Sequence, residues 1–317
     1  MMIGDSMRIL IYGAEVMGSI FAGKLFSSGN DVTILAMNKR IEELKNNGLI
    51  MKEMNKEKIE QYPIKVIDNL EPDDIYDYIL VTMQFIQVKD VLPILSKNKS
   101  KNIVLCVNNP CGYDEWKEYL GKRLMIGCHA CGGEIINNVT EYYICNGLAR
   151  AFQTTTFGEI DGTHTDRLKT IVELCTKSGI PSVISYNVED WQKCHIAIVC
   201  PIANVIYKNN GDIKALAANK SDIELMIKAT REGLNALKEL GYSVKPRKLN
   251  FYYMNMFLLT FIFGIALKSK TADLSLAKDA NDSKEEMAEL QKSFETLIKN
   301  TRTYKDDIYL LSKYNDF

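Results

Sequence analysis

A turn at residues 13–18, with the sequence GAEVMG, has nearly the spacing of a phosphate-binding loop. It follows an apolar run at 8–12 and opens an amphipathic run. In the pattern G-x-G-x-x-G, the first glycine makes the turn, the second lets the backbone approach a pyrophosphate, and the third lets the helix pack on the strand. Gly13 and Gly18 meet the first and third requirements, but Glu15 occupies the second position. The turn therefore predicts a dinucleotide site that has an acid in place of its central glycine.

Glu15 leaves two interpretations open. The amides of Val16, Met17 and Gly18, at the start of the helix, would bind the phosphates, and Glu15 would lie beside them. A carboxylate about 4 Å from a phosphate charge costs about 1 kcal/mol in water and about 4 kcal/mol at the effective dielectric of a protein surface. If the side chain points to solvent, the turn binds its cofactor with reduced affinity. If it covers the turn, the site is lost and Glu15 only complements the helix dipole.

The end of the second expected strand, at 32–37, indicates which dinucleotide would bind. NAD sites have Asp or Glu there to hold the ribose hydroxyls, whereas this chain has Asn38, Lys39 and Arg40. Cations in place of an acid favour NADP, with Lys39 or Arg40 near its 2′-phosphate. The alternative is a charged first turn on a solvated helix.

Strand-like and helix-like runs alternate through the first half of the chain, and only helical runs follow. We expect strands at 8–13, 32–37, 77–83, 102–109, 124–130, 141–147, 155–162 and 181–186. We expect helices at 16–28, 39–48, 87–98, 165–179, 188–208, 212–218, 221–240, 249–268 and 284–300, with a break or kink at Pro93. This order predicts an N-terminal Rossmann-type doubly wound α/β domain at 1–187 and a C-terminal all-α domain at 188–317, for substrate binding or dimerisation.

Composition argues against several classes of protein. Lys and Arg number 39 against 40 Asp and Glu, a net charge of −1, and no basic stripe is interleaved with aromatics, so we expect no nucleic-acid partner. The start lacks the pattern of a signal peptide, so we expect a cytoplasmic protein whose cysteines stay reduced. The apolar segment 251–267 is short for a bilayer span. We expect it to form a buried helix or a homodimer interface, without a membrane partner.

The segment Cys128-His129-Ala130-Cys131 has the form of a metal or redox motif. A structural zinc site needs four ligands, usually with a second paired motif, and a redox C-x-x-C begins a helix. Neither pattern is present here, so we predict no metal. We expect a loop near the cofactor instead, because ligands bind at the carboxyl ends of strands in such sheets.

Five segments taken together resemble the ketopantoate reductase family. They begin at residues 11, 81, 104, 155 and 191 and read IYGAEVMGSIFAGKL, VTMQFIQVKDVLPIL, VLCVNNPCGYDEW, TTFGEIDG and WQKCHIAIVCPIANVIY. The resemblance implies NADPH-dependent reduction of 2-keto acids by a Rossmann domain followed by a helical domain. It implies that Gly13 and Gly18 are cofactor glycines and that Gln87 follows the third core strand. It also places Asn109 beside the nicotinamide and substrate, and makes Lys193 the general acid toward the keto oxygen.

Lys193 suits that role chemically. Hydride addition to a keto carbon makes an alkoxide, which an ammonium protonates and stabilises. The chain departs from the family at Gln84, a cofactor-site candidate where the family has lysine, and at Ala197 and Pro201, where it has asparagines. His195 does not face Lys193 on a helix and is a candidate pocket-lining residue.

Two functions are compatible with these residues. The first is an NADP-dependent reductase of a small 2-keto acid, resembling 2-dehydropantoate 2-reductase. The second is a non-enzymatic Rossmann-like binding or interaction protein that has lost its cofactor. The side chain of Glu15 is the feature that separates them.

Overall fold

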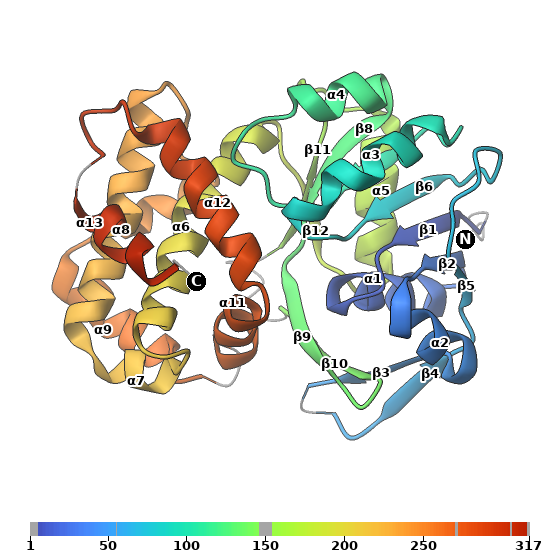
Figure 1. Ribbon diagram of the computed structural model, residues 1–317, viewed down its shortest axis with the longest axis horizontal. Coiled ribbons are helices and arrows are strands. Elements are labelled where there is room, and N and C mark those ends of the chain that lie inside the picture. Colours follow the sequence, from blue (N-terminus) through green and yellow to red (C-terminus); the bar gives the residue numbers. More distant parts are fainter. Residues whose placement is uncertain (1–5, 55, 146–153, 270–271, 305, 316–317) are drawn as a thin grey trace. The chain divides into compact units, whose positions relative to one another are not determined.

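The structure is a computed structural model that describes residues 6–54, 56–145, 154–269, 272–304 and 306–315. The chain divides into two compact units, residues 1–107 with 113–188 and residues 108–112 with 189–317. The first unit combines strands and helices. The described part of the second unit contains helices and no strand (Figure 1).

The main sheet of the first unit has eight strands among the described residues, in the order β12-β11-β8-β7-β6-β1-β2-β5. They are β1 (Arg8–Tyr12), β2 (Asp31–Leu35), β5 (Lys65–Ile67), β6 (Tyr78–Val81), β7 (Ile103–Leu105), β8 (Leu124–Cys128), β11 (Thr155–Gly158) and β12 (Ser182–Ile184). Neighbouring strands are parallel except β11 and β8. Ile9, Leu10 and Ile11 of β1 have no solvent exposure, as expected of a parallel strand covered on both faces. The predicted fold class, Rossmann-type α/β followed by all-α, is confirmed.

The chain leaves β1 in one direction along the sheet and β6 in the other. From β1 it continues through α1 (Val16–Ser27) to β2, and from β6 through α3 (Val88–Lys97) to β7 and α4 (Asp114–Leu120) to β8. Because crossovers between parallel strands are right-handed, α1 lies on the opposite face from α3 and α4 (Figure 1). The carboxyl ends of β1 and β6 therefore meet at the topological switch point, where ligands bind in sheets of this kind.

A second sheet, which we did not predict, has the order β4-β3-β10-β9. Its strands are β3 (Leu49–Glu53), β4 (Ile59–Tyr62), β9 (Cys131–Ile136) and β10 (Val139–Ile144). The strand expected at 141–147 is β10 of this sheet, and residues 146–147 lie outside the described ones. Helix α1 contacts strands of both sheets. This explains the glycine at 23, where a Cβ would lie 2.1 Å from the sulfur of Met51 on β3.

Two expected helices differ from the prediction. Helix α3 continues through Pro93, so a break there is wrong, and a kink stays a prediction. The single helix expected at 249–268 is also wrong, because the segment forms η4 (Arg247–Tyr253) and α9 (Met256–Ala266), bent by 113°. Asn255 lies at the bend and caps α9, since its side-chain oxygen accepts hydrogen bonds from the amides of Phe257 and Leu258.

The remaining helices complete both units. In the first unit they are α2 (Asn38–Asn47), η1 (Phe85–Gln87), η2 (Gly121–Arg123) and α5 (Asp166–Lys177). In the second they are α6 (Val188–Lys208), α7 (Ile213–Ala218), α8 (Lys220–Glu239), η5 (Asp273–Lys278), α11 (Asp279–Asp282), α12 (Lys284–Ile298), α13 (Asp306–Ser312) and η6 (Lys313–Asn315). No single helix in the described ranges has the length and apolar character to cross a membrane, although η4 and α9 together meet that criterion by length and composition.

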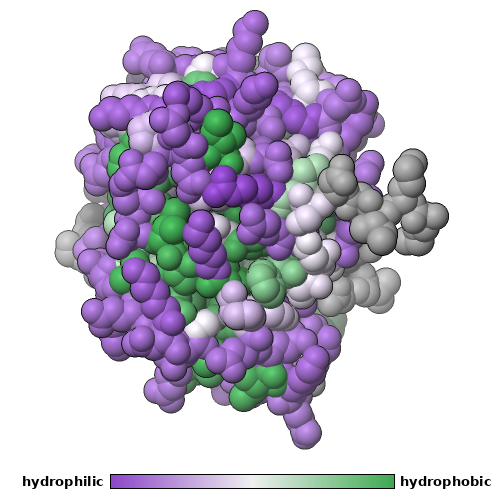
Figure 2. Space-filling view, turned by 90° about the vertical axis from the view of Figure 1, so that its right-hand side faces the viewer, coloured by the Kyte–Doolittle hydropathy of each residue, from purple (hydrophilic) through white to green (hydrophobic). Residues whose placement is uncertain are grey.

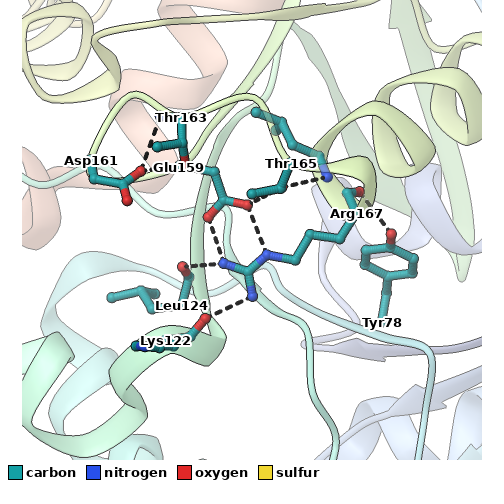
Figure 3. Close-up of polar contacts among 9 residues, drawn as sticks. Tyr78, Lys122, Leu124, Glu159, Asp161, Thr163, Thr165 and Arg167 are labelled. Carbon is teal, nitrogen blue, oxygen red and sulfur yellow. Dashed lines mark hydrogen bonds and ion pairs between the residues drawn. The ribbon is translucent and has the colours of Figure 1, made fainter.

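A partly buried ion pair between Glu159 and Arg167 holds α5 to the main sheet (Figure 3). Glu159, 4% exposed, accepts hydrogen bonds from Nε (2.7 Å) and Nη2 (2.5 Å) of Arg167 and another from the hydroxyl of Thr165. Arg167 also donates to the carbonyls of Lys122 and Leu124. Leu124 begins β8, so the pair lies at the sheet edge opposite the carboxyl ends of the parallel strands. Paired and hydrogen-bonded in this way, the buried carboxylate of Glu159 and the partly exposed guanidinium of Arg167 have a structural role.

Exposed apolar residues of the first unit are dispersed over its elements. Figure 2 shows the face at the right-hand side of Figure 1, which is mostly hydrophilic with hydrophobic residues in its middle. Across this unit, large exposed apolar side chains include Met37 before α2, Ile59 on β4 and Ile75 before β6. Single apolar residues on a surface are ordinary and do not by themselves indicate a binding site.

Candidate functional site

The turn between β1 and α1 requires both of its glycines. Gly13 has a φ of +114°, and a Cβ on it would lie 2.7 Å from the carbonyl oxygen of Thr82, which follows β6. A Cβ on Gly18 would lie 1.9 Å from the carbonyl oxygen of Gly13. The hydroxyl of Thr82 donates to the Gly13 carbonyl at 3.2 Å. The turn is thus packed directly against the end of β6, at the switch point of the sheet.

Glu15 is the N-cap residue of α1, with an extended backbone that does not require glycine. Its side chain is exposed and makes no capping hydrogen bond to the helix. By helix geometry, the amides of Val16 and Met17 have no acceptor within α1. The carboxylate therefore does not cap the amides that a phosphate would use, as in the first of the two interpretations.

Arg40 braces the turn from a buried position, with 8% exposure. It donates to five acceptors: the Ala14 carbonyl (3.1 Å), Glu43 Oε2 (3.3 Å), Asn138 Oδ1 (2.6 Å), Ser19 Oγ (3.2 Å) and Thr140 Oγ1 (3.5 Å). A guanidinium has five N–H donors, and these acceptors can occupy all of them. The structure therefore favours a bracing role for Arg40, which ties the turn to the second sheet, over the predicted contact with a 2′-phosphate.

Asn38 and Lys39 remain at the surface beyond β2. Asn38 begins α2 with a φ of +52°. The side chain of Lys39 is 88% exposed, and its ammonium lies 3.2 Å from Glu43 Oε1. An ion pair this exposed is weak, so Lys39 can exchange it for an anionic ligand. Of the two predicted cations, Lys39 is the one that is accessible.

Gln84 and Gln87 form a reciprocal capping box around η1, at the carboxyl end of β6. The amide of Gln84 donates to the side-chain oxygen of Gln87 at 3.2 Å. Their observed role is to order the segment after Thr82, at the sheet edge that also carries the β1–α1 turn. Contact with a cofactor stays a prediction for both residues.

The side chain of Asn109 forms hydrogen bonds within its own loop. Its side chain is 3% exposed, donates to the Gly112 carbonyl at 2.7 Å and accepts from the Cys111 amide at 2.8 Å. Residues 108–112 belong to the second unit. A Cβ on Gly112 would lie 3.6 Å from Glu189 Oε1, so the loop lies beside the start of α6.

Lys193 is 1% exposed, although lysines are almost never fully buried unless they are paired. Its ammonium lies 2.7 Å from Glu189 Oε1, one turn earlier on α6, and 4.9 Å from the ring centroid of Tyr242. Burial, together with the nearby Glu189 and Asp190 carboxylates, raises the pKa of Tyr242. Glu189 thus lies against both Lys193 and the loop that carries Asn109.

His195 points in a different direction from Lys193. Its ring stacks on that of Trp191, with centroids 5.1 Å apart and an interplanar angle of 23°. This agrees with the expectation that residues two apart on a helix do not face each other. A pocket-lining role for His195 stays a prediction.

The Cys128–Cys131 segment lies beside the β1–α1 turn. Cys128 ends β8, Cys131 begins β9, and both are buried. The sulfur of Cys131 is 3.7 Å from that of Met17. Among the described residues, no group of three or more His, Cys, Asp or Glu side chains is arranged to hold a metal ion.

His129 should make stability depend on pH. Burial lowers its pKa to about 4, although the residue as a whole is partly exposed. In the unfolded chain the pKa is about 6.5, so that state binds the proton first as pH falls. We expect the free energy of unfolding to drop by roughly 1–2 kcal/mol between pH 6.5 and 4 from this group. Urea unfolding of His129→Gln should show a shallower pH dependence in that window. An unchanged slope would mean that another group is responsible.

Sequence reasoning missed two residues of the candidate site, Thr82 and Glu189, and missed the bracing role of Arg40. Thr82 carried no signal beyond its position directly after a strand. The buried role of Arg40 depends on acceptors almost 100 residues away. Glu189 was detectable, because a glutamate four residues before a lysine is a favourable helical pair. A surface hollow lined by residues such as Asn47, Gln61 and Pro63 contains none of the predicted site residues.

Comparisons with known proteins agree with this architecture. A family model described as ketopantoate reductase PanE/ApbA matches residues 9–143. The 2-dehydropantoate 2-reductase of Pyrococcus horikoshii is 24% identical over 255 residues, covering 77% of this chain and 78% of that protein. An uncharacterized oxidoreductase of Bacillus subtilis, YkpB, is 25% identical over 228 residues, covering 70% and 72%.

Solved structures share the fold across nearly the whole chain. The 2-dehydropantoate 2-reductase of Geobacter metallireducens has a TM-score of 0.78 at 14% identity, with 98% of this chain and 99% of that chain covered. D-mandelate dehydrogenase in complex with NADH and anilino(oxo)acetate has a TM-score of 0.76 at 13% identity, with 98% and 97% covered.

Proposed function

Because the chain is similar to the ketopantoate reductase family over residues 9–143 and to 2-dehydropantoate 2-reductases over most of its length, we propose that it is a divergent member of that family and an NADP-dependent reductase of a small 2-keto acid. The main support from the structure is the β1–α1 turn, which lies at the switch point of the sheet with Glu15 exposed and not capping the first amides of α1. An oxidoreductase follows from the family. The cofactor preference, the substrate and the residue roles below are our proposals.

In this proposal the first unit binds the cofactor through surfaces on three adjacent strands. The amides of Val16 and Met17 hold the pyrophosphate. The exposed ammonium of Lys39 neutralises the 2′-phosphate. Met37, 50% exposed after β2, and Ile86, 39% exposed after β6, offer apolar contacts for the adenine ring.

Lys193 is the proposed general acid. Bound NADPH would supply a hydride to the keto carbon and become NADP⁺, and the Lys193 ammonium would give its proton to the developing alkoxide, leaving a hydroxy acid and a neutral amine. Glu189, at 2.7 Å, orients the ammonium. Because 39% of the Glu189 side chain is exposed, it also connects Lys193 to solvent, which supplies the next proton.

Cofactor binding can be tested with NADPH and NADH, by thermal shift and by cofactor fluorescence, in wild type and Glu15→Gln. Because Glu15 is exposed, the cost near 1 kcal/mol estimated for water applies, and we expect Glu15→Gln to bind NADPH about 5-fold more tightly. The gain should shrink at high salt, because an exposed charge is screened. Glu42→Gln, which changes a carboxylate on α2, is the control and should leave affinity unchanged.

The outcomes separate the two candidate functions. The reductase is supported if wild type binds NADPH and then oxidises it in the presence of a 2-keto acid. The panel of 2-keto acids includes ketopantoate and an aromatic member. Binding seen only in Glu15→Gln would favour a protein that has lost its cofactor. Absence of binding in both proteins at about 1 mM NADPH would overturn the proposal, since even weak ligands raise the melting temperature.

A further inference from the structure

The loop between α8 and η4, residues 240–246, is fastened to the first turns of α6. Asp190, 6% exposed, accepts a hydrogen bond from the Ser243 amide at 2.9 Å. The sulfur of Cys194, which is fully buried, donates to the Ser243 carbonyl at 3.6 Å and accepts from the Lys245 amide at 3.5 Å. Asp190 and Cys194 are four residues apart, so they lie on the same side of α6. The position of Tyr242, directly before Ser243, is therefore fixed against this helix.

Tyr242 lies beside the ammonium of Lys193, with its ring centroid 4.9 Å from Nζ. An ammonium over an aromatic ring at this distance is attracted by the ring. The Glu189 carboxylate, at 2.7 Å, is the only hydrogen-bond acceptor of this ammonium among the described residues. An ammonium has three N–H donors, and Lys193 is buried. A buried ammonium with two unused donors indicates that a ligand supplies the remaining oxygen acceptors.

The phenol of Tyr242 is a further unused donor beside that ammonium. Its hydroxyl makes no hydrogen bond to any residue in the described part of the chain. The side chain is partly exposed, so a ligand that enters from solvent can reach it. Burial and the carboxylates of Glu189 and Asp190 raise the pKa of Tyr242. The phenol therefore keeps its proton at neutral pH and is available as a donor.

We propose that Tyr242 determines specificity for 2-keto acids, by donating its phenol hydrogen to the substrate carboxylate while Lys193 donates to the keto oxygen. The inference rests on the proposed reductase function. In a 2-keto acid the keto and carboxylate oxygens are on adjacent carbons, so their two donors must be neighbours, as Tyr242 and Lys193 are. Glu189 already neutralises the ammonium, which leaves it little net attraction for a second carboxylate. A hydrogen bond from the neutral phenol to the carboxylate is charge-assisted and strong.

The two parts of Tyr242 have different roles, and two substitutions separate them. The ring positions the Lys193 ammonium, and the hydroxyl binds the substrate. Tyr242→Phe keeps the ring and removes only the hydroxyl. Tyr242→Leu removes both, so it should also lower kcat, by about 2- to 30-fold, because the ammonium loses its contact with the ring.

Steady-state kinetics of Tyr242→Phe test the hydroxyl, with the preferred 2-keto acid and with its methyl ester, which carries no carboxylate charge. We expect KM for the acid to rise about 10- to 100-fold, the effect of losing a hydrogen bond to a charged group. The kcat for the acid and the KM for the ester should stay close to wild type. The preference for acid over ester therefore falls by the same factor. A merely structural role of Tyr242 would change both substrates equally.

Tyr309→Phe is the matched control. Tyr309 lies on α13 of the same unit, is 53% exposed, and has the Nζ of Lys313 4.6 Å from its ring centroid. The substitution removes the same hydroxyl from another tyrosine–lysine pair, which contains none of the proposed site residues. It should leave KM, kcat and the preference for acid over ester unchanged. Circular dichroism establishes that each variant is folded.

A second measurement requires no turnover. Oxamate has a carboxylate next to an amide carbonyl, and its binding is measured by isothermal titration calorimetry with NADP⁺ present. We expect Tyr242→Phe to bind oxamate about 10- to 100-fold more weakly than wild type. Tyr309→Phe should bind oxamate as wild type does.

The outcomes distinguish this inference from the reductase function. Turnover of a 2-keto acid with the same oxamate affinity, or the same acid-to-ester preference, in Tyr242→Phe would overturn the role of Tyr242 and leave the reductase intact. Oxamate binding that depends on Tyr242, in a protein that reduces no 2-keto acid, would overturn the reductase and keep the carboxylate site. A wild type that neither reduces a 2-keto acid nor binds oxamate would overturn both.

Discussion

Lys193→Met is expected to lower kcat for reduction of the preferred 2-keto acid by about 10²–10⁴-fold, the usual contribution of a general acid. Methionine fills a similar volume but cannot donate a proton to the alkoxide. The affinity for NADPH should stay within about twofold of wild type, because the cofactor turn lies in the other unit and contains none of the residues that contact Lys193. Steady-state kinetics on the substrate with the highest wild-type turnover measures both quantities.

The structure separates this effect from simple loss of stability. Removing Lys193 leaves Glu189 without its partner, but 39% of the Glu189 side chain is exposed and water can solvate its charge. We therefore expect the free energy of unfolding to change by less than about 2 kcal/mol, below the cost of leaving a buried charge unpaired. Lys292→Met changes a lysine of the same unit that is 78% exposed, and it should leave kcat intact. A decrease of less than threefold in Lys193→Met would mean that the proton comes from another group.

Most of the main sheet was predictable because its strands carry their own signal, but the short edge strand β5 (KVI), which is exposed or partly exposed throughout, was missed. Parallel strands covered on both faces are short apolar runs. RILIY and DVTIL can therefore be recognised as strands from their own residues, without knowing which strands pair with them. The second sheet has no such signal. LIMKE mixes buried Leu49 and Met51 with partly exposed residues, IEQY is exposed or partly exposed throughout, and β3 pairs with β10, where Ile50 lies opposite Val139. A partner that distant in sequence cannot be inferred from local pattern.

The candidate site was predictable to the extent that it depends on backbone. Two glycines in a strand–turn–helix segment indicate a tight turn whatever else surrounds them. The roles of the side chains were harder to infer, because whether a side chain can contact a ligand depends on its solvent exposure in the fold. Arg40 and Lys39 are adjacent cations with the same apparent suitability for a phosphate, yet one is 8% exposed and braced by Asn138 and Thr140 while the other has an 88% exposed side chain.

The role of Glu15 also could not be inferred without knowing how exposed its side chain is. The sequence shows that the central glycine is missing, and electrostatics bounds the cost between about 1 and 4 kcal/mol. Only the structure, in which the side chain is exposed and makes no capping hydrogen bond, favours the lower value. The N-cap backbone of Glu15 is extended, a conformation open to any residue, so the substitution does not strain the turn. Gly13 and Gly18, the first and third glycines of the pattern, cannot be replaced without such strain.

Gly18→Ala is accordingly expected to destabilise the protein by about 3 kcal/mol or more, the upper range for overpacking a core. The added methyl would lie 1.9 Å from the Gly13 carbonyl and 2.8 Å from the Thr82 hydroxyl. The first contact is with backbone, which cannot rotate away as a side chain can, so α1 must move off the turn. That movement also displaces the amides of Val16 and Met17. We therefore expect NADPH binding to fall below detection, even at temperatures where the variant is folded.

Gly264→Ala is the matched control, because it makes the same change in another helix. A Cβ there meets its nearest neighbours at 3.8 Å, an ordinary contact. Alanine favours a helix over glycine by roughly 0.5–1 kcal/mol, so Gly264→Ala should keep or slightly raise the free energy of unfolding. Urea unfolding of the two variants compares the same chemical change with and without a backbone contact. Equal stabilities would show that α1 does not pack on the turn as closely as Gly18 implies, and the proposed phosphate site would lose its geometric basis.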